Sequence, residues 1–160
     1  MVRFKNRWLL VEFLPCSPGT NATTYQPTAG NEMNSRQIWS ALKQSVINNF
    51  GDIGWGAVST SLTIKYYSPT TNVCIIRVAR DQHQIAWGGV TFLSSIEGRK
   101  YIPNVIHVSG TIKQAQLAAI KHNREVVARY RSKAGTPATY QDSYETFLQT
   151  STQEIEALQD

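Results

Sequence analysis

Apolar residues recur along the chain with two spacings, a repeat of two that is typical of strands and a repeat near 3.6 that is typical of helices. Residues 3–14 are apolar at both odd and even positions, which predicts a strand covered on both faces and therefore central in a sheet. Residues 34–50 then follow the helical spacing. Asn34 and Gln37 have the spacing of a capping box at the start of this helix, and Gly51 is placed to end it.

The middle of the chain returns to strand spacing. Residues 61–66 alternate between apolar and polar, which predicts an edge strand with one wet face, whereas residues 73–80 are apolar on both faces and belong in the middle of the sheet. A second helix is expected over 81–95, where the glycine pair at 88 and 89 implies a closely packed neighbour. A short fourth strand is expected over 105–108.

This order of elements, followed by a long basic third helix, predicts an α+β fold of ferredoxin-like or RRM-like type. Its four-stranded antiparallel sheet would have strands one and three at the centre and helices on both faces. Residues 1–133 would form this single domain, with 15–34 as a flexible loop or insertion, and 134–160 would be an acidic tail with at most one short helix. The third strand, VCIIRVAR, has no aromatic residue to stack a base, so the third helix is expected to cover that face.

Charge is distributed unevenly along this fold. The chain has sixteen Lys and Arg against eleven Asp and Glu, a net charge of +5. Five of the acids lie after Lys133 and no base does, so residues 1–133 carry +10 and the last 27 residues carry −5. A basic body of this kind favours RNA or DNA as its partner.

The third helix concentrates part of this positive charge. Thr111 and Gln114 have capping-box spacing, so the helix is expected to begin near Ile112, and its N-terminal N–H groups would favour an anion beside Thr111. One side of the helix is apolar, and a second side carries Lys113, Arg124 and Arg131, with Lys121 nearby. The alternative is that these are the scattered bases of an ordinary surface helix.

Several other classes of protein find no support. No apolar run approaches the ~20 residues of a membrane span and the N-terminus does not begin a secretory signal, so we expect a soluble intracellular protein. Cys16 and Cys74 fit free thiols in a reducing compartment, although their pairing stays open. No HExxH, CxxC, Walker or GxGxxG motif indicates a metal or nucleotide site. His107 lacks a nucleophile or spaced carboxylate to work with, which favours a structural or interface histidine over a catalytic one.

Two segments together resemble a known family. MVRFKNRWLL at the start and HVSGTIKQAQLAAIKHNR at 107–124, with NVCIIRVAR between them, resemble the small RRM-like protein subunit shared by eukaryotic ribonuclease P and ribonuclease MRP. That family is the fifth of the "processing of precursor RNA" subunits. The chain departs from its usual pattern at Trp8, Ser109 and Ala79, and the loop at 15–34 is longer than expected.

The resemblance implies an RNA-binding subunit without catalytic residues of its own. The particle would remove the 5′ leader of precursor tRNA, and a sister particle would process rRNA precursors. Catalysis would belong to the RNA and its bound magnesium, and this chain would bind no cofactor. The implied partners are the catalytic RNA and a TIM-barrel-like protein subunit, with precursor tRNA nearby and no membrane. The implied location is the nucleus, and within it the nucleolus.

The predicted RNA-binding residues are basic side chains and the turn into the third helix. Arg3, Lys5 and Arg7 alternate along one face of the first strand, either to track phosphates or only to keep a strand end soluble. Arg77 and Arg80 fall on opposite faces of the third strand by parity. The full set is Arg3, Lys5, Arg7, Arg77, Arg80, Gly110, Thr111, Lys113, Lys121, Arg124 and Arg131.

Two other functions compete with this interpretation. A stand-alone RNA-binding module, outside any ribonuclease particle, would show sequence preference as an isolated protein. A small phosphatase of acylphosphatase type would have the same topology, but it needs an anion-cradling loop with an arginine after the first strand. Residues 15–34 contain no basic residue, which argues against the phosphatase.

Overall fold

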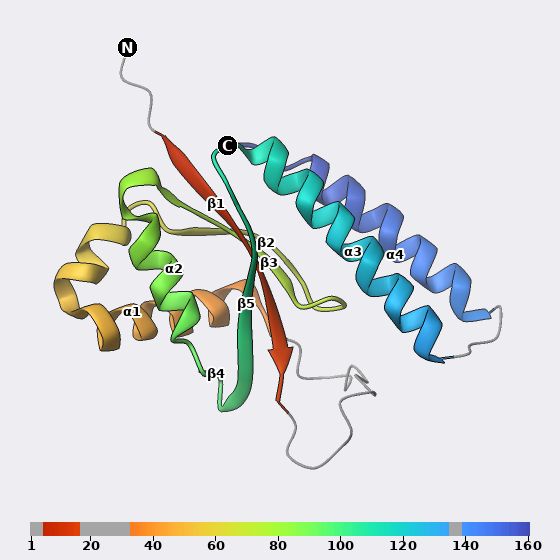
Figure 1. The fold of residues 1–160 in the computed structure, drawn as a ribbon, viewed down its shortest axis with the longest axis horizontal. Helices are drawn as coiled ribbons and strands as arrows, with labels where there is room; N and C mark the ends of the chain where they lie inside the picture. The colour runs from red at the N-terminus through yellow and green to blue at the C-terminus, as the bar shows by residue number, and fades with distance from the viewer. Residues whose placement is uncertain (1–4, 17–32, 135–138) are drawn as a thin grey trace.

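An antiparallel sheet of five strands, in the order β2-β3-β1-β5-β4, forms the centre of the computed structural model (Figure 1). The structure describes residues 5–16, 33–134 and 139–160. Its strands are β1 (Asn6–Pro15), β2 (Thr63–Ser68), β3 (Val73–Ala79), β4 (Ser95–Ile96) and β5 (Arg99–Ser109). Its helices are α1 (Ser35–Val58), α2 (His83–Thr91), α3 (Ile112–Ala134) and α4 (Thr139–Glu156), with a 3-10 turn at Arg80–Gln82.

The central position of β1 and β3 is confirmed, and β2 lies at an edge as predicted. The prediction of four strands was wrong, because a short hairpin joins β4 to a β5 that runs over eleven residues. Glu97 and Gly98 make this turn with φ values of 49° and 75°, the left-handed geometry of a two-residue hairpin. The sequence Glu97-Gly98 is a weaker turn signal than Asn-Gly or Asp-Gly. The start of β5 was not predicted because Arg99 and Lys100 are charged and do not continue the apolar pattern of a strand.

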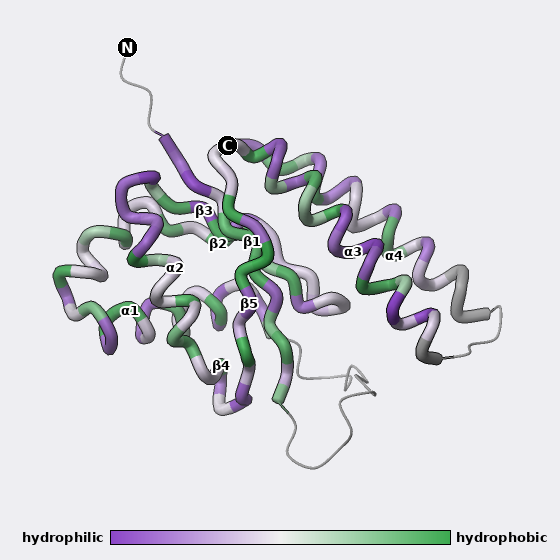
Figure 2. Tube along the Cα trace, viewed as in Figure 1, coloured by the Kyte–Doolittle hydropathy of each residue, from purple (hydrophilic) through white to green (hydrophobic). Residues whose placement is uncertain are grey.

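Helices cover both faces of the sheet, with α1 and α2 on one side and α3 and α4 on the other (Figure 1). Leu9, Val11 and Phe13 of β1 pack in the core beneath α1 and α2. Trp8 and Leu10 point the other way and pack against α3. The expected role of the third helix as a cover is therefore confirmed, and Figure 2 shows β1 between the two layers, hydrophilic at its start and mainly hydrophobic further along.

Helix α1 begins as predicted but continues past its expected end. Asn34 and Gln37 form the capping box, with both hydrogen bonds at 3.0 Å. Gly51 takes a left-handed φ of 69° and kinks the helix, after which residues 52–58 are again helical. Trp55 then reaches Trp39, with ring centroids 5.5 Å apart. Glycine therefore marks a kink here and not the end of the helix.

The glycine pair in α2 packs as closely as predicted. A Cβ on Gly88 would lie 2.6 Å from Cζ of Phe50, and one on Gly89 would lie 2.5 Å from Cγ2 of Val46. The helix itself is shorter than the predicted 81–95, because residues 80–82 form a 3-10 turn and Phe92 caps its end.

The acidic segment forms an 18-residue helix, longer than the short one expected, and lies beside α3 in an antiparallel pair (Figure 1). Ile155 is fully buried against the α3 side of the core. A buried polar chain also holds α4 in place: Ser151 Oγ is 2.8 Å from the Tyr66 hydroxyl and accepts a hydrogen bond from Asn123 Nδ2 at 2.9 Å. Thr71 Oγ1 donates to Asn123 Oδ1 at 2.9 Å, so β2, α3, α4 and the β2–β3 turn are joined.

Candidate nucleic-acid interface

The antiparallel pairing gathers most predicted RNA-binding residues at one end of the sheet. Asn6 pairs with Ala79 and Trp8 pairs with Ser109, so the start of β1 meets the ends of β3 and β5 and the beginning of α3. We call this the basic end, formed by Lys5, Arg7, Arg77, Arg80 and Lys113. Arg3, the remaining predicted strand residue, lies outside the described residues, as do residues 17–32 of the predicted loop.

Gly110 and Arg7 are directly linked at this end. A Cβ on Gly110 would lie 3.3 Å from Nη1 of Arg7, so the guanidinium packs over the turn that leads from β5 into α3. The same Nη1 donates to the backbone oxygen of Asn6 at 3.1 Å. A larger residue at position 110 would therefore press on the Arg7 side chain, which lies across the turn. The same packing places the Arg7 cation beside the N-terminus of α3.

Thr111 caps the start of α3. Its Oγ1 accepts a hydrogen bond from the Gln114 N–H at 3.4 Å, and its carbonyl accepts one from Ser109 Oγ at 2.9 Å. No acidic residue lies in the first turn of α3, and Lys113 in that turn is exposed. The positive end of the helix dipole and the Lys113 and Arg7 cations thus act in the same direction on an approaching anion.

Arg77 and Arg80 occupy different surroundings. Arg77 is paired with Trp8 on the α3 side of the sheet, where Oδ1 of Asp160 lies 3.5 Å from its Nε. Arg80 lies beyond the end of β3, in the 3-10 turn, so strand parity does not govern its direction. Its Nε is 3.1 Å from Asp81 Oδ1, and its backbone N–H donates to the Lys5 carbonyl at 2.8 Å, which brings Arg80 to the first strand.

The C-terminal residues cover part of the basic end. Asp160 Oδ1 also accepts a hydrogen bond from Asn6 Nδ2 at 3.0 Å, and the Gln159 carbonyl accepts one from Lys65 Nζ at 3.4 Å. Because α4 runs antiparallel to α3, its C-terminal end returns to the start of α3. Asp160, the last acid of the chain, therefore lies next to the cations of the basic end. The charge asymmetry in the sequence therefore becomes a direct contact between tail and body.

Along α3 the predicted residues divide between two sides. Lys121 and Arg124 are exposed, and Lys121 Nζ lies 3.9 Å from Glu125 Oε1. Arg131 is drawn toward α4, with Nη2 3.9 Å from Glu145 Oε1, so it does not continue the same exposed row. Arg129, which is not among the predicted RNA-binding residues, is exposed and lies about two turns beyond Lys121. Its spacing of eight from Lys121 is the signal that would have included it.

Helix α3 has a narrower exposed strip than its sequence implies because it is buried against both the sheet and α4. Gln116 shows the second contact, since its Nε2 donates to the Ile155 carbonyl at 2.9 Å and to the Leu158 carbonyl at 3.0 Å. We call the exposed bases Lys121, Arg124 and Arg129 the helix row. From Lys113 to Arg124 the helix advances about 16 Å, enough to follow several phosphates from the basic end.

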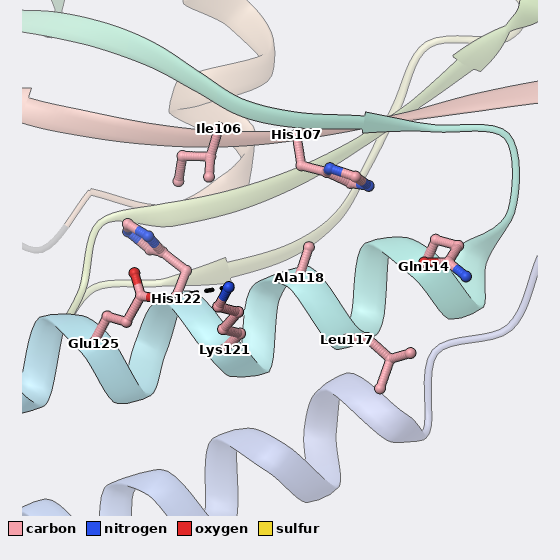
Figure 3. A pocket seen from close by; sticks show the side chains of 8 residues that line it. All are labelled: Ile106, His107, Gln114, Leu117, Ala118, Lys121, His122 and Glu125. Atoms are coloured by element: carbon pink, nitrogen blue, oxygen red, sulfur yellow. Dashed lines mark ion pairs between the residues drawn. The ribbon is translucent and has the colours of Figure 1, made fainter.

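A cavity of about 390 Å³ lies between β5 and α3, and Figure 3 shows the side chains that line it. His107 enters it from β5 and is exposed, whereas His122 comes from α3 and is buried. Nε2 of His122 lies 3.4 Å from Oε1 of Glu12. No group of three potential metal ligands occurs in the described parts of the chain. Lys121, His122 and Glu125 line the cavity with His107, but the lining in the described part of the chain contains no Ser, Thr or Cys that could act as a nucleophile.

Two buried hydroxyl and thiol groups have perturbed acidity. Burial raises the pKa of the Tyr66 hydroxyl, with hydrogen bonds to Ser151 and Ser68 acting in the opposite direction. Burial also raises the pKa of the Cys74 thiol, which keeps it protonated and inert, while Cys16 is an exposed free thiol. None of the described helices is long and apolar enough to cross a membrane.

The chain is similar to proteins of one family along most of its length. The Rpp14/Pop5 family matches residues 7–120. "Ribonuclease P/MRP protein subunit POP5" of Schizosaccharomyces pombe is 39% identical over 129 residues, which cover 79% of this chain and 91% of that protein. "Probable ribonuclease P/MRP protein subunit POP5" of Arabidopsis thaliana is 32% identical over 125 residues, which cover 78% and 81%.

A solved structure has the same fold. A chain in the cryo-EM structure of yeast ribonuclease MRP aligns with a TM-score of 0.51 at 9% sequence identity. The alignment covers 81% of this chain and 98% of that chain.

Proposed function

Because this chain belongs to the Rpp14/Pop5 family, we propose that it is an RNA-binding protein subunit of ribonuclease P and ribonuclease MRP. It would hold the catalytic RNA in shape for removal of the precursor tRNA 5′ leader and for rRNA precursor processing. Magnesium would reside on the RNA. The chain would contribute no catalytic residue, would work in the nucleus and nucleolus, and would lie beside a TIM-barrel-like protein subunit and near precursor tRNA.

The observation that carries this proposal is the basic end. Arg7, Arg80 and Lys113 come from three segments that are far apart in sequence, yet the sheet and the turn at Gly110 bring them to one end beside a helix N-terminus. Cations and free N–H groups in this arrangement bind phosphate backbone without reading bases. Such binding suits a protein that supports a folded RNA whose own structure supplies the specificity.

The direct test is to isolate the chain with what it binds. A tag joined through a flexible linker allows gentle purification from native extract, after which the bound RNA is sequenced and cleavage of precursor tRNA is assayed with and without magnesium. We expect one or two abundant structured RNAs and magnesium-dependent 5′ cleavage. A diffuse set of RNAs without cleavage would contradict the proposal and favour a stand-alone RNA-binding module.

A further inference from the structure

The cavity of about 390 Å³ between β5 and α3 lies beside the helix row (Figure 3). Its volume falls in the range of roughly 300–1,000 Å³ that is typical of sites for small organic groups. Lys121 belongs both to the cavity lining and to the helix row. A group joined to a phosphate that is bound on the helix row therefore has this cavity within reach.

A β-bulge in β5 turns two consecutive side chains toward the cavity. The pairing of β1 with β5 shifts after Leu10, which pairs with His107. Val11 then pairs with Val105, so Ile106 is an extra residue in β5. Ile106 and His107 both line the cavity, whereas successive side chains of a regular strand point to opposite faces. Figure 3 shows both side chains extending from β5 toward α3, and bulges recur beside functional sites because they redirect side chains in this way.

The walls of the cavity combine an aromatic ring with apolar and amide groups. His107 on β5 is exposed, and histidine is one of the aromatic side chains on which unpaired RNA bases stack. Leu117 and Ala118 supply the apolar part of the α3 wall, and Leu117 is 50% exposed. Gln114 adds an amide that can donate and accept hydrogen bonds. This combination suits a nucleobase, which has flat apolar faces and a polar edge.

His122 forms a buried part of the cavity wall and points from α3 toward the sheet (Figure 3). Its side chain is 8% exposed, and its Nε2 has no hydrogen bond to any of the described residues. The Glu12 carboxylate is the charged group beside it, with Oε1 3.4 Å from Nε2. Buried polar side chains are normally hydrogen-bonded. The imidazole therefore retains hydrogen-bonding capacity at the wall of the cavity.

Charge sets the direction in which a nucleotide can lie. Lys113 is exposed in the first turn of α3, where the positive end of the helix dipole also attracts anions. Glu125 lines the cavity farther along the helix, and its Oε1 lies 3.9 Å from Nζ of Lys121. This carboxylate repels a phosphate, which is drawn instead toward Lys113. The uncharged base, and not the phosphate, is thus the part of a nucleotide that fits the cavity.

We infer that the cavity between β5 and α3 holds one unpaired nucleobase of the bound RNA, stacked on His107, with the adjoining phosphates on Lys113 and Lys121. The inference rests on the proposed function and deepens it, because it adds a base contact to an interface of phosphate contacts. The third strand has no aromatic residue to stack a base, so this cavity takes over a role that the open sheet lacks. An apolar protein segment would instead bury the Lys121–Glu125 ion pair, which costs desolvation energy.

Site-specific crosslinking tests the inference in the native complex. A photoreactive phenylalanine analogue replaces His107 in the tagged full-length chain, and the same analogue at Asn104 is the matched control. Asn104 is exposed and pairs with Glu12 on the same side of the sheet, but it does not line the cavity. We expect position 107 to crosslink to one nucleotide of the copurified RNA, mapped by reverse transcription. Chemical probing should show that nucleotide to be unpaired, and position 104 should not label it.

The outcomes separate this inference from the proposed function. Crosslinks from position 107 to protein alone, to base-paired RNA, or to nothing in a complex that retains its RNA would overturn the inference and leave the proposed function standing. A chain that copurifies with no specific RNA would reject both.

Substitutions at His107 then separate stacking from charge. His107→Ala should weaken binding of the copurified RNA at least about five-fold in fluorescence anisotropy, because the stacking surface is lost. His107→Phe keeps an aromatic face and should bind within about two-fold of the wild type, whereas His107→Leu should lose as much as His107→Ala. The salt dependence should stay the same in all three variants, since a stacked base releases no counter-ion.

The control for these variants is Asn104→Ala, which should change affinity by less than about two-fold. His107 is exposed, so all of its variants should fold, and circular dichroism checks this. Wild-type affinity in folded His107→Ala, or an equal loss in His107→Phe and His107→Ala, would reject stacking on this ring.

Discussion

Oδ1 of Asp160 lies 3.5 Å from Nε of Arg77, so the last acid of the chain pairs with a cation at the basic end of the sheet. The two side chains are 59% and 31% exposed, which makes this a surface ion pair of small energy. The pair matters because of its place, since Arg77 is one of the predicted RNA-binding residues. RNA that approaches Arg77 must share this cation with a carboxylate or displace it.

Removal of that carboxylate charge should strengthen RNA binding. Asp160→Asn keeps the shape and the acceptor for Asn6 Nδ2 but leaves Arg77 without its anion. We expect affinity for the particle RNA to rise by about two- to five-fold at low salt, with the gain lost at high salt. Filter binding over a salt series measures this, with Glu156→Gln as a control for loss of one negative charge on α4. An equal gain in both variants would show only a general charge effect.

Reversal of charge along α3 should weaken RNA binding without unfolding the protein. Lys113 and Arg124 are both exposed, so Lys113→Glu with Arg124→Glu disturbs no core contact. We expect affinity to fall at least about ten-fold near 0.1 M salt and the salt dependence to become shallower by about two counter-ions. Fluorescence anisotropy with the particle RNA measures both quantities.

The control for this double variant is Lys100→Glu, an exposed base in the β4–β5 hairpin at the opposite end of the sheet. It should change affinity by less than about two-fold. If the double variant remains folded and binds RNA as the wild type does, α3 has no place in the RNA interface.

The buried pair Glu12 and His122 should stabilise the contact between β1 and α3. Their side chains are 11% and 8% exposed, with 3.4 Å between Oε1 and Nε2. Within the described residues Nε2 of His122 makes no other hydrogen bond, so Glu12 is its nearest polar partner; His122→Ala removes this contact, and the free energy of unfolding should fall by about 1–3 kcal/mol. Urea unfolding followed by tryptophan fluorescence measures the change. Glu12→Gln combined with His122→Ala should recover part of it, and a single variant as stable as the wild type would refute this role.

Stability at alkaline pH should report on the contact between Tyr66 and α4. Burial raises the pKa of the Tyr66 hydroxyl above its ordinary value of 10.0, so the folded state favours the protonated form. This contribution is complete below pH 10.0 and is lost as pH rises further, because the unfolded chain ionises first. The free energy of unfolding should therefore fall above about pH 10. Tyr66→Phe should show a smaller fall, and identical pH curves for the two proteins would contradict the prediction.

The sequence predicted the sheet best where hydrophobic periodicity is strong. Residues of β1 and β3 are apolar on both faces and lie centrally, and the capping box at Asn34 set the start of α1 correctly. Local signals failed at Gly51, because a glycine with positive φ can kink a helix as well as end it. They also failed at Glu97-Gly98, where a hairpin forms without a strong turn sequence.

The candidate site was harder to predict because its contacts are distant in sequence. Spacing on α3 identified Lys121 and Arg124 as exposed bases, but it could not show that Arg131 turns to Glu145 on α4. Nor could it show that Asp160 reaches Arg77, since this depends on how α4 returns along α3. Periodicity describes one element at a time, and these pairs arise only when two elements pack.

The two apolar faces of β1 have a consequence for how its pairing is chosen. A shift of one residue exchanges the two faces of a strand, and in β1 this would still bury apolar residues on both sides. Hydrophobicity therefore specifies the register of this strand only weakly. Glu12 breaks the ambiguity, because in the observed register it meets His122, whereas a shifted strand would bury its carboxylate beneath α1 and α2. One polar side chain in an apolar strand thus favours the native alignment.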